Sequence, residues 1–319
     1  MVSPNPRPFF TGYLPEQDGH QIYYEQYGNE NGPTIVVFHG GPGDKSKPRH
    51  IGGYELDKYR VIIFDQRGCG KSTPSGDIEN NTTQDILEDT ERLRATLKVN
   101  TWFVAGGSWG STAALAYAEA YPDRVRGLLL SSIFLARKRD EEWSFTKQGE
   151  IGRIFPDVWE HRVEFLEKYG AKPTDAAKLL LSKLESSKPE VAAEIAAGVM
   201  DWEGNLMDAQ SDVKITESGD VTEENIASVK IFLHYESNAF FLNENQLLNN
   251  VEKIKNIPTV IVHGRYDLLC PVEQTWELQK HLDKVDVVIL PTSNHRLTAE
   301  GRIAKNLAYN YFLSKHSHK

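Results

Sequence analysis

Short apolar runs and helical segments alternate along the first part of the chain. Thr34–Phe38 and Arg60–Phe64 are almost continuously apolar, which is typical of strands buried on both faces of a sheet. Asp85–Lys98 and Trp109–Ala120 have the apolar spacing of helices. Alternation of this kind predicts a mostly parallel sheet with helices on both faces. Further strands are expected at Gln21–Gly28, Thr101–Ala105 and Val125–Ser131.

The pattern is interrupted in the middle of the chain and returns near its end. Strands are expected at Thr259–His263 and Val285–Leu290, around a helix at Val272–Leu282, and Ser314–Lys319 is expected to be a polar tail. The intervening residues contain only helical patterns, at Asp157–Tyr169, Thr174–Ser186, Pro189–Trp202 and Thr222–Leu242. We therefore expect residues 1–134 and 257–319 to form an α/β core and residues 135–256 to form a helical cap inserted between two strands.

Composition limits the class of protein without identifying its chemistry. No run approaches the roughly 18–20 apolar residues of a membrane helix, and residues 1–8 lack the apolar segment of a secretion signal. Two cysteines, Cys69 and Cys270, are too few for a disulfide scaffold and suggest a reducing, cytoplasmic compartment. The net charge of −9, from 36 basic and 45 acidic residues, disfavours a nucleic-acid partner. We expect a protein without membrane or nucleic-acid partners; its oligomeric state stays open.

The strongest chemical signal is the segment Gly106-Gly107-Ser108-Trp109-Gly110-Ser111, where a strand is expected to run directly into an alanine-rich helix. A nucleophilic serine in this context lies on a sharp turn with its hydroxyl exposed above the sheet. Gly106 and Gly110 would allow the strand and helix backbones to approach closely. The alternative is a glycine-rich turn without a nucleophile, which the flanking strand and helix disfavour.

A nucleophile of this kind predicts an acid and then a histidine later in the chain. Asp267 follows the expected strand Thr259–His263, where its carboxylate can orient an imidazole; an ordinary loop aspartate is the alternative. The histidines after Asp267 lie in a predicted helix or in the tail, except His295, which follows the last expected strand. His295 is therefore the expected base, and His263 is expected to be a buried structural histidine.

Acyl transfer also needs hydrogen-bond donors for the developing oxyanion. The segment His39-Gly40-Gly41-Pro42-Gly43 matches the glycine-rich loop that supplies one backbone N–H in many esterases. We assign the donors to the N–H groups of Gly41 and Trp109. The chain contains no phosphate-binding loop, dinucleotide fingerprint or zinc-ligand spacing, so we expect no metal and no cofactor.

These motifs together resemble the proline iminopeptidases (prolyl aminopeptidases), serine peptidases of the α/β-hydrolase fold. The resemblance implies release of an N-terminal residue, preferably proline, from short peptides or amides through an acyl-enzyme, without metal or cofactor. It covers nearly the whole chain and is carried by His39–Gly43, Asp65–Ser72, Gly106–Ser111, Ile133–Leu135, Ile154–Glu160, Asp201–Glu203, His263–Asp267 and Cys270-Pro271.

An aminopeptidase must also hold the protonated amine of its substrate, and the resemblance implies that Glu203 does so. A second glutamate of the family is replaced here by Phe232. If this segment is helical, Glu236 lies one turn later on the same face, where it either restores the amine contact or is a surface residue. Phe134 and Tyr235 either line an apolar slot for a pyrrolidine ring or belong to the core.

The departures from the family pattern leave other functions open. Phe232 makes the pocket more apolar, so we expect weaker proline selectivity or a shift toward amides and esters of other hydrophobic residues. A broader amidase or esterase and a hydrolase of a specialised metabolite are the alternatives on this scaffold. A ligand receptor with little turnover is a third, which the complete set of Ser108, Asp267 and His295 disfavours. Smaller departures are Ser131, where the family commonly has Arg, and Asn294, where Gly is usual.

Overall fold

An eight-stranded sheet lies at the centre of the computed structural model, which describes residues 6–145, 151–173, 175–208 and 215–317. The strand order is β1-β2-β4-β3-β5-β6-β7-β8; β1 and β2 are antiparallel additions, and the strands from β3 to β8 run parallel. The strands are β1 (Phe10–Tyr13), β2 (Tyr23–Gly28), β3 (Thr34–Phe38), β4 (Arg60–Phe64), β5 (Trp102–Ser108), β6 (Val125–Ile133), β7 (Thr259–Gly264) and β8 (Val285–Leu290).

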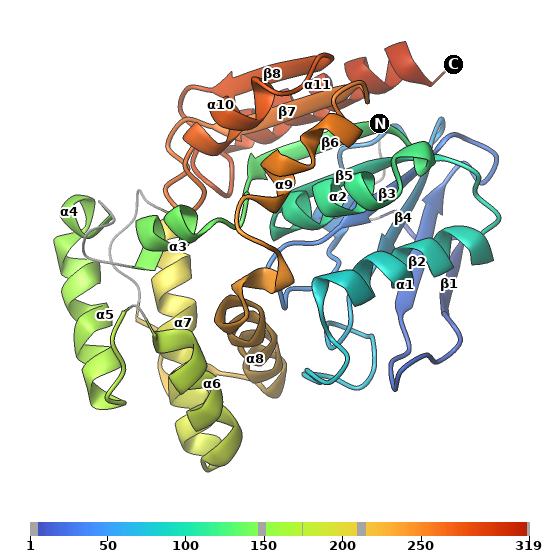
Figure 1. The fold of residues 1–319 in the computed structure, drawn as a ribbon. Helices are drawn as coiled ribbons and strands as arrows, with labels where there is room; N and C mark the ends of the chain where they lie inside the picture. Colours follow the sequence, from blue (N-terminus) through green and yellow to red (C-terminus); the bar gives the residue numbers. More distant parts are fainter. Residues whose placement is uncertain (1–5, 146–150, 174, 209–214, 318–319) are drawn as a thin grey trace.

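Helices cover the sheet and also form a separate group beside it (Figure 1). The α-helices are α1 (Thr83–Thr96), α2 (Trp109–Ala120), α3 (Lys138–Phe145), α4 (Ile151–Ile154), α5 (Pro156–Lys168), α6 (Ala176–Ser186), α7 (Pro189–Asp208), α8 (Glu223–Ser237), α9 (Gln246–Asn249), α10 (Glu273–Gln279) and α11 (Ala299–His316). Short 3-10 helices are η1 (Pro48–His50), η2 (Pro122–Arg124), η3 (Ser218–Asp220), η4 (Ala239–Phe241) and η5 (Val251–Lys253).

The strands bury apolar side chains on both faces of the sheet. In β3, for example, Val36 and Phe38 belong to the core under α1 and α2, whereas Ile35 and Val37 belong to the core under α11. Successive side chains of a strand point to opposite faces, so a continuously apolar run serves both cores at once. The expected architecture, a mostly parallel sheet with helices on both faces, is confirmed.

Between β6 and β7 the described residues form helices and connecting segments, and no strand. Helices α5 to α8 share an apolar cluster of their own, which includes Leu166, Leu180, Ile195 and Phe232. In Figure 1 these helices stand together at one end of the sheet, in green to brown colours. Most of the helices expected from the pattern are therefore present in this segment; Thr174 lies outside the described residues.

The main error of the sequence pattern lies at the C-terminus. Residues 299–316 form the long helix α11, which the pattern did not predict, and the expected tail is helical as far as His316. Tyr309, Phe312 and Leu313 face the core, but Ile303 and Leu307 are more than half exposed on the other side of the helix. Apolar residues on both sides blur the helical periodicity.

A smaller correction concerns the helix expected at Thr222–Leu242. Helix α8 ends at Ser237 because Ala239, Phe240 and Phe241 adopt positive φ angles of 48°, 53° and 54°. Such angles interrupt an α-helix, and sequence periodicity does not report them.

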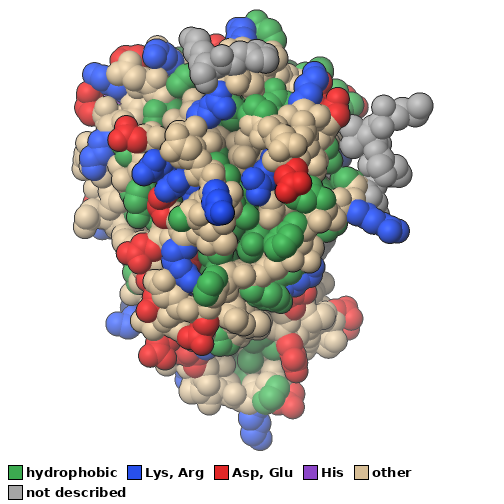
Figure 2. Space-filling view, turned by 90° about the vertical axis from the view of Figure 1, so that its right-hand side faces the viewer, with side chains coloured by type: hydrophobic (Ala, Val, Ile, Leu, Met, Phe, Trp, Pro, Cys, Tyr) green, Lys and Arg blue, Asp and Glu red, His purple; other side chains and the backbone are tan. Residues whose placement is uncertain are grey.

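None of the helices in the described ranges is long and apolar enough to cross a bilayer. On the face drawn in Figure 2, acidic and basic side chains are interspersed.

One buried carboxyl group in the core has little compensation. Glu119, near the end of α2, is 4% exposed, and neither of its carboxyl oxygens has a hydrogen-bond partner of good geometry among the described residues. Burial raises the pKa of Glu119 to about 8, although the Asn250 amide and the Lys253 charge act in the opposite direction. The folded state therefore favours the neutral carboxyl group.

Replacement of this group should make stability less dependent on pH. Between the ordinary carboxyl pKa and about 8, folded Glu119 keeps a proton that the unfolded chain has released, so the free energy of unfolding falls as pH rises. We expect Glu119→Gln to resemble the wild type at pH 5 and to exceed its stability by about 2 kcal/mol at pH 8 in urea denaturation. The exposed Glu88→Gln is the control; an equal effect of Glu119→Gln at both pH values would contradict this account.

Candidate active site

The proposed nucleophile lies at the sharp turn between β5 and α2. Ser108 ends the strand with φ 57° and ψ −133°, a backbone conformation that side-chain-bearing residues rarely adopt. A Cβ atom at Gly106 would lie 2.0 Å from the Gly110 carbonyl oxygen, and one at Gly110 would lie 2.4 Å from the Phe38 carbonyl oxygen. Only glycine fits these two positions, which explains the sequence around the serine.

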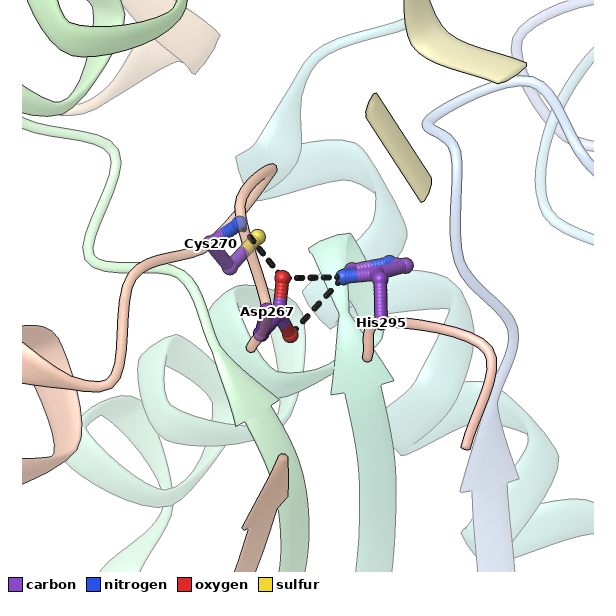
Figure 3. Close-up of side chains that lie close together, drawn as sticks. All are labelled: Asp267, Cys270 and His295. Carbon is purple, nitrogen blue, oxygen red and sulfur yellow. Dashed lines mark hydrogen bonds and ion pairs between the residues drawn. The ribbon is translucent and has the colours of Figure 1, made fainter. Parts of the chain in front are cut away.

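The acid and the histidine come together after β7 and β8 (Figure 3). His295 Nδ1 lies 2.9 Å from both carboxylate oxygens of Asp267. Asp267 also accepts a hydrogen bond from the Cys270 backbone N–H at 2.8 Å, and its other oxygen lies 3.3 Å from Nε2 of His263. His263 is fully buried, in agreement with its expected structural role.

The carboxylate of Asp267 is held in its ionised form. Its burial raises the pKa, but His295 and His263 act more strongly in the opposite direction, through charge and hydrogen bonds, and hold the pKa well below the ordinary range. A permanently ionised carboxylate at Nδ1 fixes the ring and stabilises an imidazolium cation.

Cys270 lies between Ser108 and the pair formed by Asp267 and His295, because its thiol interacts with the serine and its backbone N–H with the aspartate. The Ser108 hydroxyl interacts with the Cys270 thiol, whereas no hydrogen bond between described residues joins Ser108 to His295. Catalytic hydrogen bonds are often long before the substrate binds. The structure thus brings Ser108, Cys270, Asp267 and His295 together. Among the described residues, no hydrogen bond is formed between Ser108 and His295.

Asp267, Cys270 and His295 also offer three potential metal-ligand atoms within 4.8 Å of one another. The imidazole Nδ1 already faces the carboxylate at 2.9 Å. Burial raises the pKa of the Cys270 thiol well above its ordinary value, and a protonated thiol is a poor metal ligand. The donor set therefore fits proton transfer better than metal binding.

The glycine-rich loop after β3 lies directly beside the serine. A Cβ atom on Gly40 would be 3.7 Å from the Ser108 Cβ. Gly41 has φ +114°, and a side chain there would meet the backbone N atoms of Gly43 and Asp44 at 2.6 Å and 2.7 Å. The loop can therefore adopt this close path only with glycine at position 41.

Gln66 connects this loop to the helix that follows the serine. Its side-chain Oε1 accepts a hydrogen bond from Trp109 Nε1 at 2.9 Å, and its Nε2 donates to the His39 carbonyl oxygen at 3.0 Å. The Gln66 backbone N–H donates to His39 Nε2 at 3.0 Å, so the proton of the neutral ring lies on Nδ1, which donates to the Gly40 carbonyl oxygen at 2.8 Å. One side chain thereby fixes the two segments that carry Gly41 and Trp109.

The cap contains a narrow cavity with charged walls. Phe232 and Glu236 both line it, so the expectation that they share one helix face is confirmed. The indole Nε1 of Trp202 is buried, with no hydrogen-bond partner among the described residues. The lining residues are Arg162, Ala176, Ala177, Leu180, Val199, Trp202, Glu203, Phe232, Leu233 and Glu236.

Two carboxyl groups and one guanidinium group share this cavity. Burial, together with the charges of Glu236 and Asp44, raises the pKa of Glu203 to about 8, while the charge of Arg162 acts in the opposite direction. Burial raises the pKa of Glu236 to about 7, again opposed by Arg162. The guanidinium lies 4.7 Å from the Trp202 ring. A cation that enters would stabilise the ionised carboxylates, so the cavity favours a positively charged group.

The same cavity lies close to the serine. The charge of Glu203 acts on the Cys270 thiol, which itself interacts with the Ser108 hydroxyl. The pKa of Glu203 is also raised by the charge of Asp44, which directly follows the glycine-rich loop. The carboxyl groups of the cap thus face the same region as Ser108 and the loop of Gly41.

The two aromatic candidates pack around Trp109 instead of lining this cavity. Tyr235 is fully buried; its hydroxyl donates to Asn81 Oδ1 at 2.9 Å, and its ring meets Trp109 edge-on at 5.1 Å between centroids. Phe134 is partly buried and packs edge-on against Phe240 at 5.0 Å. Both rings support the walls of the site through neighbouring side chains.

Sequence reasoning did not identify Gln66, Arg162 or Cys270 as parts of the site. Gln66 and Cys270 lie in segments that the family resemblance includes, but nothing in their spacing reveals what they contact. Arg162 occupies a helix and resembles a surface charge until folding buries it, with 5% of its surface exposed.

Comparisons with known proteins show which family the chain belongs to. Residues 33–301 match the family described as alpha/beta hydrolase fold. A probable proline iminopeptidase of Leptolyngbya boryana is 40% identical over 92% of this chain and 91% of its own, and a proline iminopeptidase of Xylella fastidiosa is 39% identical over 92% of each. A solved proline iminopeptidase-related protein from Thermus thermophilus superposes with a TM-score of 0.56 at 21% identity, covering 97% of this chain and 98% of its own.

The fold and the family match make this protein an α/β hydrolase. At 39–40% identity over more than nine-tenths of its length, the chain belongs to the proline iminopeptidase family. The resemblance inferred from the motifs is therefore confirmed.

The contacts of Gln66 generate a test. We expect Gln66→Ala to lower kcat by about 10-fold or more with little change in KM, because the oxyanion loop and the Trp109 helix lose their common anchor. Steady-state kinetics on an aminoacyl naphthylamide, with thermal denaturation to verify folding, measure this. Gln21→Ala, at an exposed position, is the matched control. A rise in KM alone would show that Gln66 does not support the transition state.

Proposed function

We propose that this protein is a serine aminopeptidase that releases an N-terminal residue, preferably proline, from short peptides or amides. Ser108 is the nucleophile, His295 the general base and Asp267 its orienting acid. The observation that supports this activity most directly is the Glu203–Glu236 cavity, whose charge suits a protonated amine and whose Glu203 acts by its charge on the Cys270 thiol that interacts with Ser108.

The proposed reaction has two steps. His295 removes the proton of Ser108 as the hydroxyl oxygen attacks the scissile carbonyl carbon, and the N–H groups of Gly41 and Trp109 stabilise the oxyanion. The imidazolium then gives its proton to the leaving amine as the C–N bond breaks. In the second step His295 deprotonates a water molecule, which attacks the acyl-enzyme and releases the amino acid and free Ser108. Throughout both steps, Asp267 keeps the His295 ring in the tautomer that carries a proton on Nδ1.

Glu236 supplies the carboxyl group that Phe232 no longer provides. Both side chains line the same cavity, so a carboxylate has moved by one helical turn while the helix face is unchanged. Arg162 neutralises part of the combined charge, which leaves the pair with a net negative charge suited to one ammonium group. The phenyl ring at position 232 makes one wall more apolar than a second glutamate would.

That apolar wall favours a second candidate, a broader amidase or esterase for amino acids other than proline. The same triad and amine site would serve it, and only the size and shape preference at the acyl residue would differ. A comparison of prolyl, alanyl and leucyl naphthylamides separates the two candidates.

Three further expectations belong to this proposal. Residues 135–256 act as one cap that closes over the carboxyl ends of the strands. The partner is a small peptide, amino-acid amide or ester. The compartment is the cytoplasm, which suits the free buried thiols of Cys69 and Cys270.

Loss of the nucleophile tests the chemistry. We expect Ser108→Ala to lower turnover of prolyl-naphthylamide by at least about 10³-fold and to abolish labelling by a fluorophosphonate probe. Ser314→Ala, exposed on α11, should be labelled like the wild type. Retained turnover in a folded Ser108→Ala protein would refute the assignment.

Loss of the carboxyl groups tests the amine site. We expect Glu203→Gln and Glu236→Gln each to lower kcat/KM for prolyl-naphthylamide by about 10-fold or more, chiefly through KM, because a charged hydrogen bond is lost. Nitrophenyl acetate, which has no amine, should change by less than about 2-fold. Glu223→Gln, exposed at the start of α8, is the control.

The same site predicts a pH dependence. Because the pKa values of Glu203 and Glu236 are about 8 and about 7, a fall from pH 8 to pH 6 protonates them and should raise KM for the aminoacyl substrate. If activity on the ester and on the aminoacyl substrate fell by the same factor, neither glutamate would bind the substrate amine.

A further inference from the structure

Four basic side chains gather beside the glycine-rich loop, at the junction of two segments that are distant in sequence. Lys47 and Arg49 follow the loop, and Arg302 and Lys305 lie in the first turns of α11. The charges of Arg49 and Arg302 both act on Lys305, and those of Arg49 and Lys305 both act on His50. These charge interactions join Arg49, Arg302 and Lys305, and Lys47 shares its ion-pair partner Asp44 with Arg49. We call these four residues the basic cluster.

Packing holds the two segments together. Asn310 Nδ2 donates to the Gly53 carbonyl oxygen at 2.9 Å, and a Cβ atom on Gly53 would lie 2.3 Å from Asn306 Oδ1. Tyr54 stacks on Tyr309, with centroids 6.4 Å apart. The basic cluster is therefore built on a fixed contact between α11 and the loop that follows β3.

The cluster has an excess of positive charge. Its acidic partner is Asp44, whose carboxylate lies 2.6 Å from Lys47 Nζ and 3.2 Å from Arg49 Nη2. Among the ion pairs of the described residues, none involves Arg302 or Lys305. Among the ion pairs of the described residues, Asp44 is therefore the one carboxylate partner of the four cations, in a chain whose net charge is −9.

The surroundings of Lys305 add to this imbalance. Its ammonium lies 5.7 Å from the centre of the Tyr309 ring. Burial, together with Arg49 and Arg302, lowers the pKa of Lys305 to about 8. His50 is kept neutral, because burial lowers its pKa to about 3. An anion placed here would gain several charged hydrogen bonds and relieve the repulsion.

Two chains of contacts link the cluster to the neighbourhood of the nucleophile. Tyr309, below Lys305, interacts with the Ser131 hydroxyl, and a Cβ atom on Gly107 would lie 2.6 Å from Ser131 Oγ. Gly107 directly precedes Ser108. On the other side, Asp44 directly follows Gly43 of the glycine-rich loop and acts on Glu203 in the cap.

The region around Ser108 therefore has an acidic side in the cap and a basic side formed by α11 and the loop after β3. A short peptide is a zwitterion, with an ammonium group at one end and a carboxylate at the other. We propose that Arg49, Arg302 and Lys305 bind the C-terminal carboxylate of short peptide substrates on the leaving-group side of the scissile bond. This inference builds on the proposed aminopeptidase function and adds a second recognition site to it.

Substrate pairs that differ only in this carboxylate test the proposal. We would measure kcat/KM for Pro-Gly, Pro-Gly-Gly and Pro-Gly-Gly-Gly, each as the free acid and as the C-terminal amide. We expect the acid to exceed the amide by about 10-fold at one of these lengths. Because an extended residue spans about 3.3–3.6 Å, the preferred length measures the distance from Ser108 to the cluster.

Charge variants assign the preference to residues. Lys305→Gln and Arg302→Gln should each bring the acid-to-amide ratio close to one, and Lys305→Glu should invert it. Lys315→Gln is the matched control, since Lys315 also lies over a tyrosine ring of α11 but belongs to the last turn; its ratio should equal that of the wild type. Thermal denaturation verifies that each variant is folded. If either Lys305→Gln or Arg302→Gln fails to fold, the other variant still tests the proposal.

The outcomes separate this proposal from the proposed function. Hydrolysis of prolyl-naphthylamide, which has no carboxylate, supports the aminopeptidase activity alone. Hydrolysis of all peptides with an acid-to-amide ratio near one at every length would overturn the carboxylate site and leave the aminopeptidase intact. A preference that survives in Lys305→Glu would also overturn it. No hydrolysis of any prolyl substrate by the wild type would overturn both.

Discussion

The turn at Ser108 is the constraint around which the rest of the molecule is arranged. A strand from the centre of the sheet must pass into a helix within one residue, with φ at 57°. This is possible only because Gly106 and Gly110 leave room for backbone atoms of the helix and of β3. The strand that carries this strained residue lies between β3, which is fully buried, and β6, which is buried at all but one position, so the surrounding sheet supplies the stability that the turn itself lacks.

Helix α8 is in direct backbone contact with the glycine-rich loop that lies beside this turn. A Cβ atom on Gly43, at the end of the glycine-rich loop, would lie 2.3 Å from the Ser228 carbonyl oxygen of α8. The same helix carries Phe232 and Glu236, which line the cavity of the cap. Gln66 in turn joins the loop to Trp109. Helix α8 and the glycine-rich loop beside Ser108 are therefore positioned directly against each other.

Charge placement gives the site its polarity. Glu203 and Glu236 are partly buried, which raises their pKa values to about 8 and about 7, and the charge of Arg162 opposes this rise. Asp267 is fully ionised because two histidines face it. Glu236 and Phe232 lie one helical turn apart on the same wall of the cavity, so a carboxyl group and an apolar ring face it side by side.

Much of this was determined by the sequence alone. Apolar runs predicted the parallel strands, and chain order with local context singled out Ser108, Asp267 and His295, because strand periodicity and turn chemistry are local properties. The sequence missed α11, whose exposed apolar residues Ile303 and Leu307 hide its periodicity. Only the tertiary structure decided that Gln66 joins the glycine-rich loop to Trp109, that Arg162 lines the cavity between α5 and α8, and that the charge of Arg49 acts on Lys305. These contacts join residues far apart in the chain, and their energies depend on burial and distance, which no local pattern encodes.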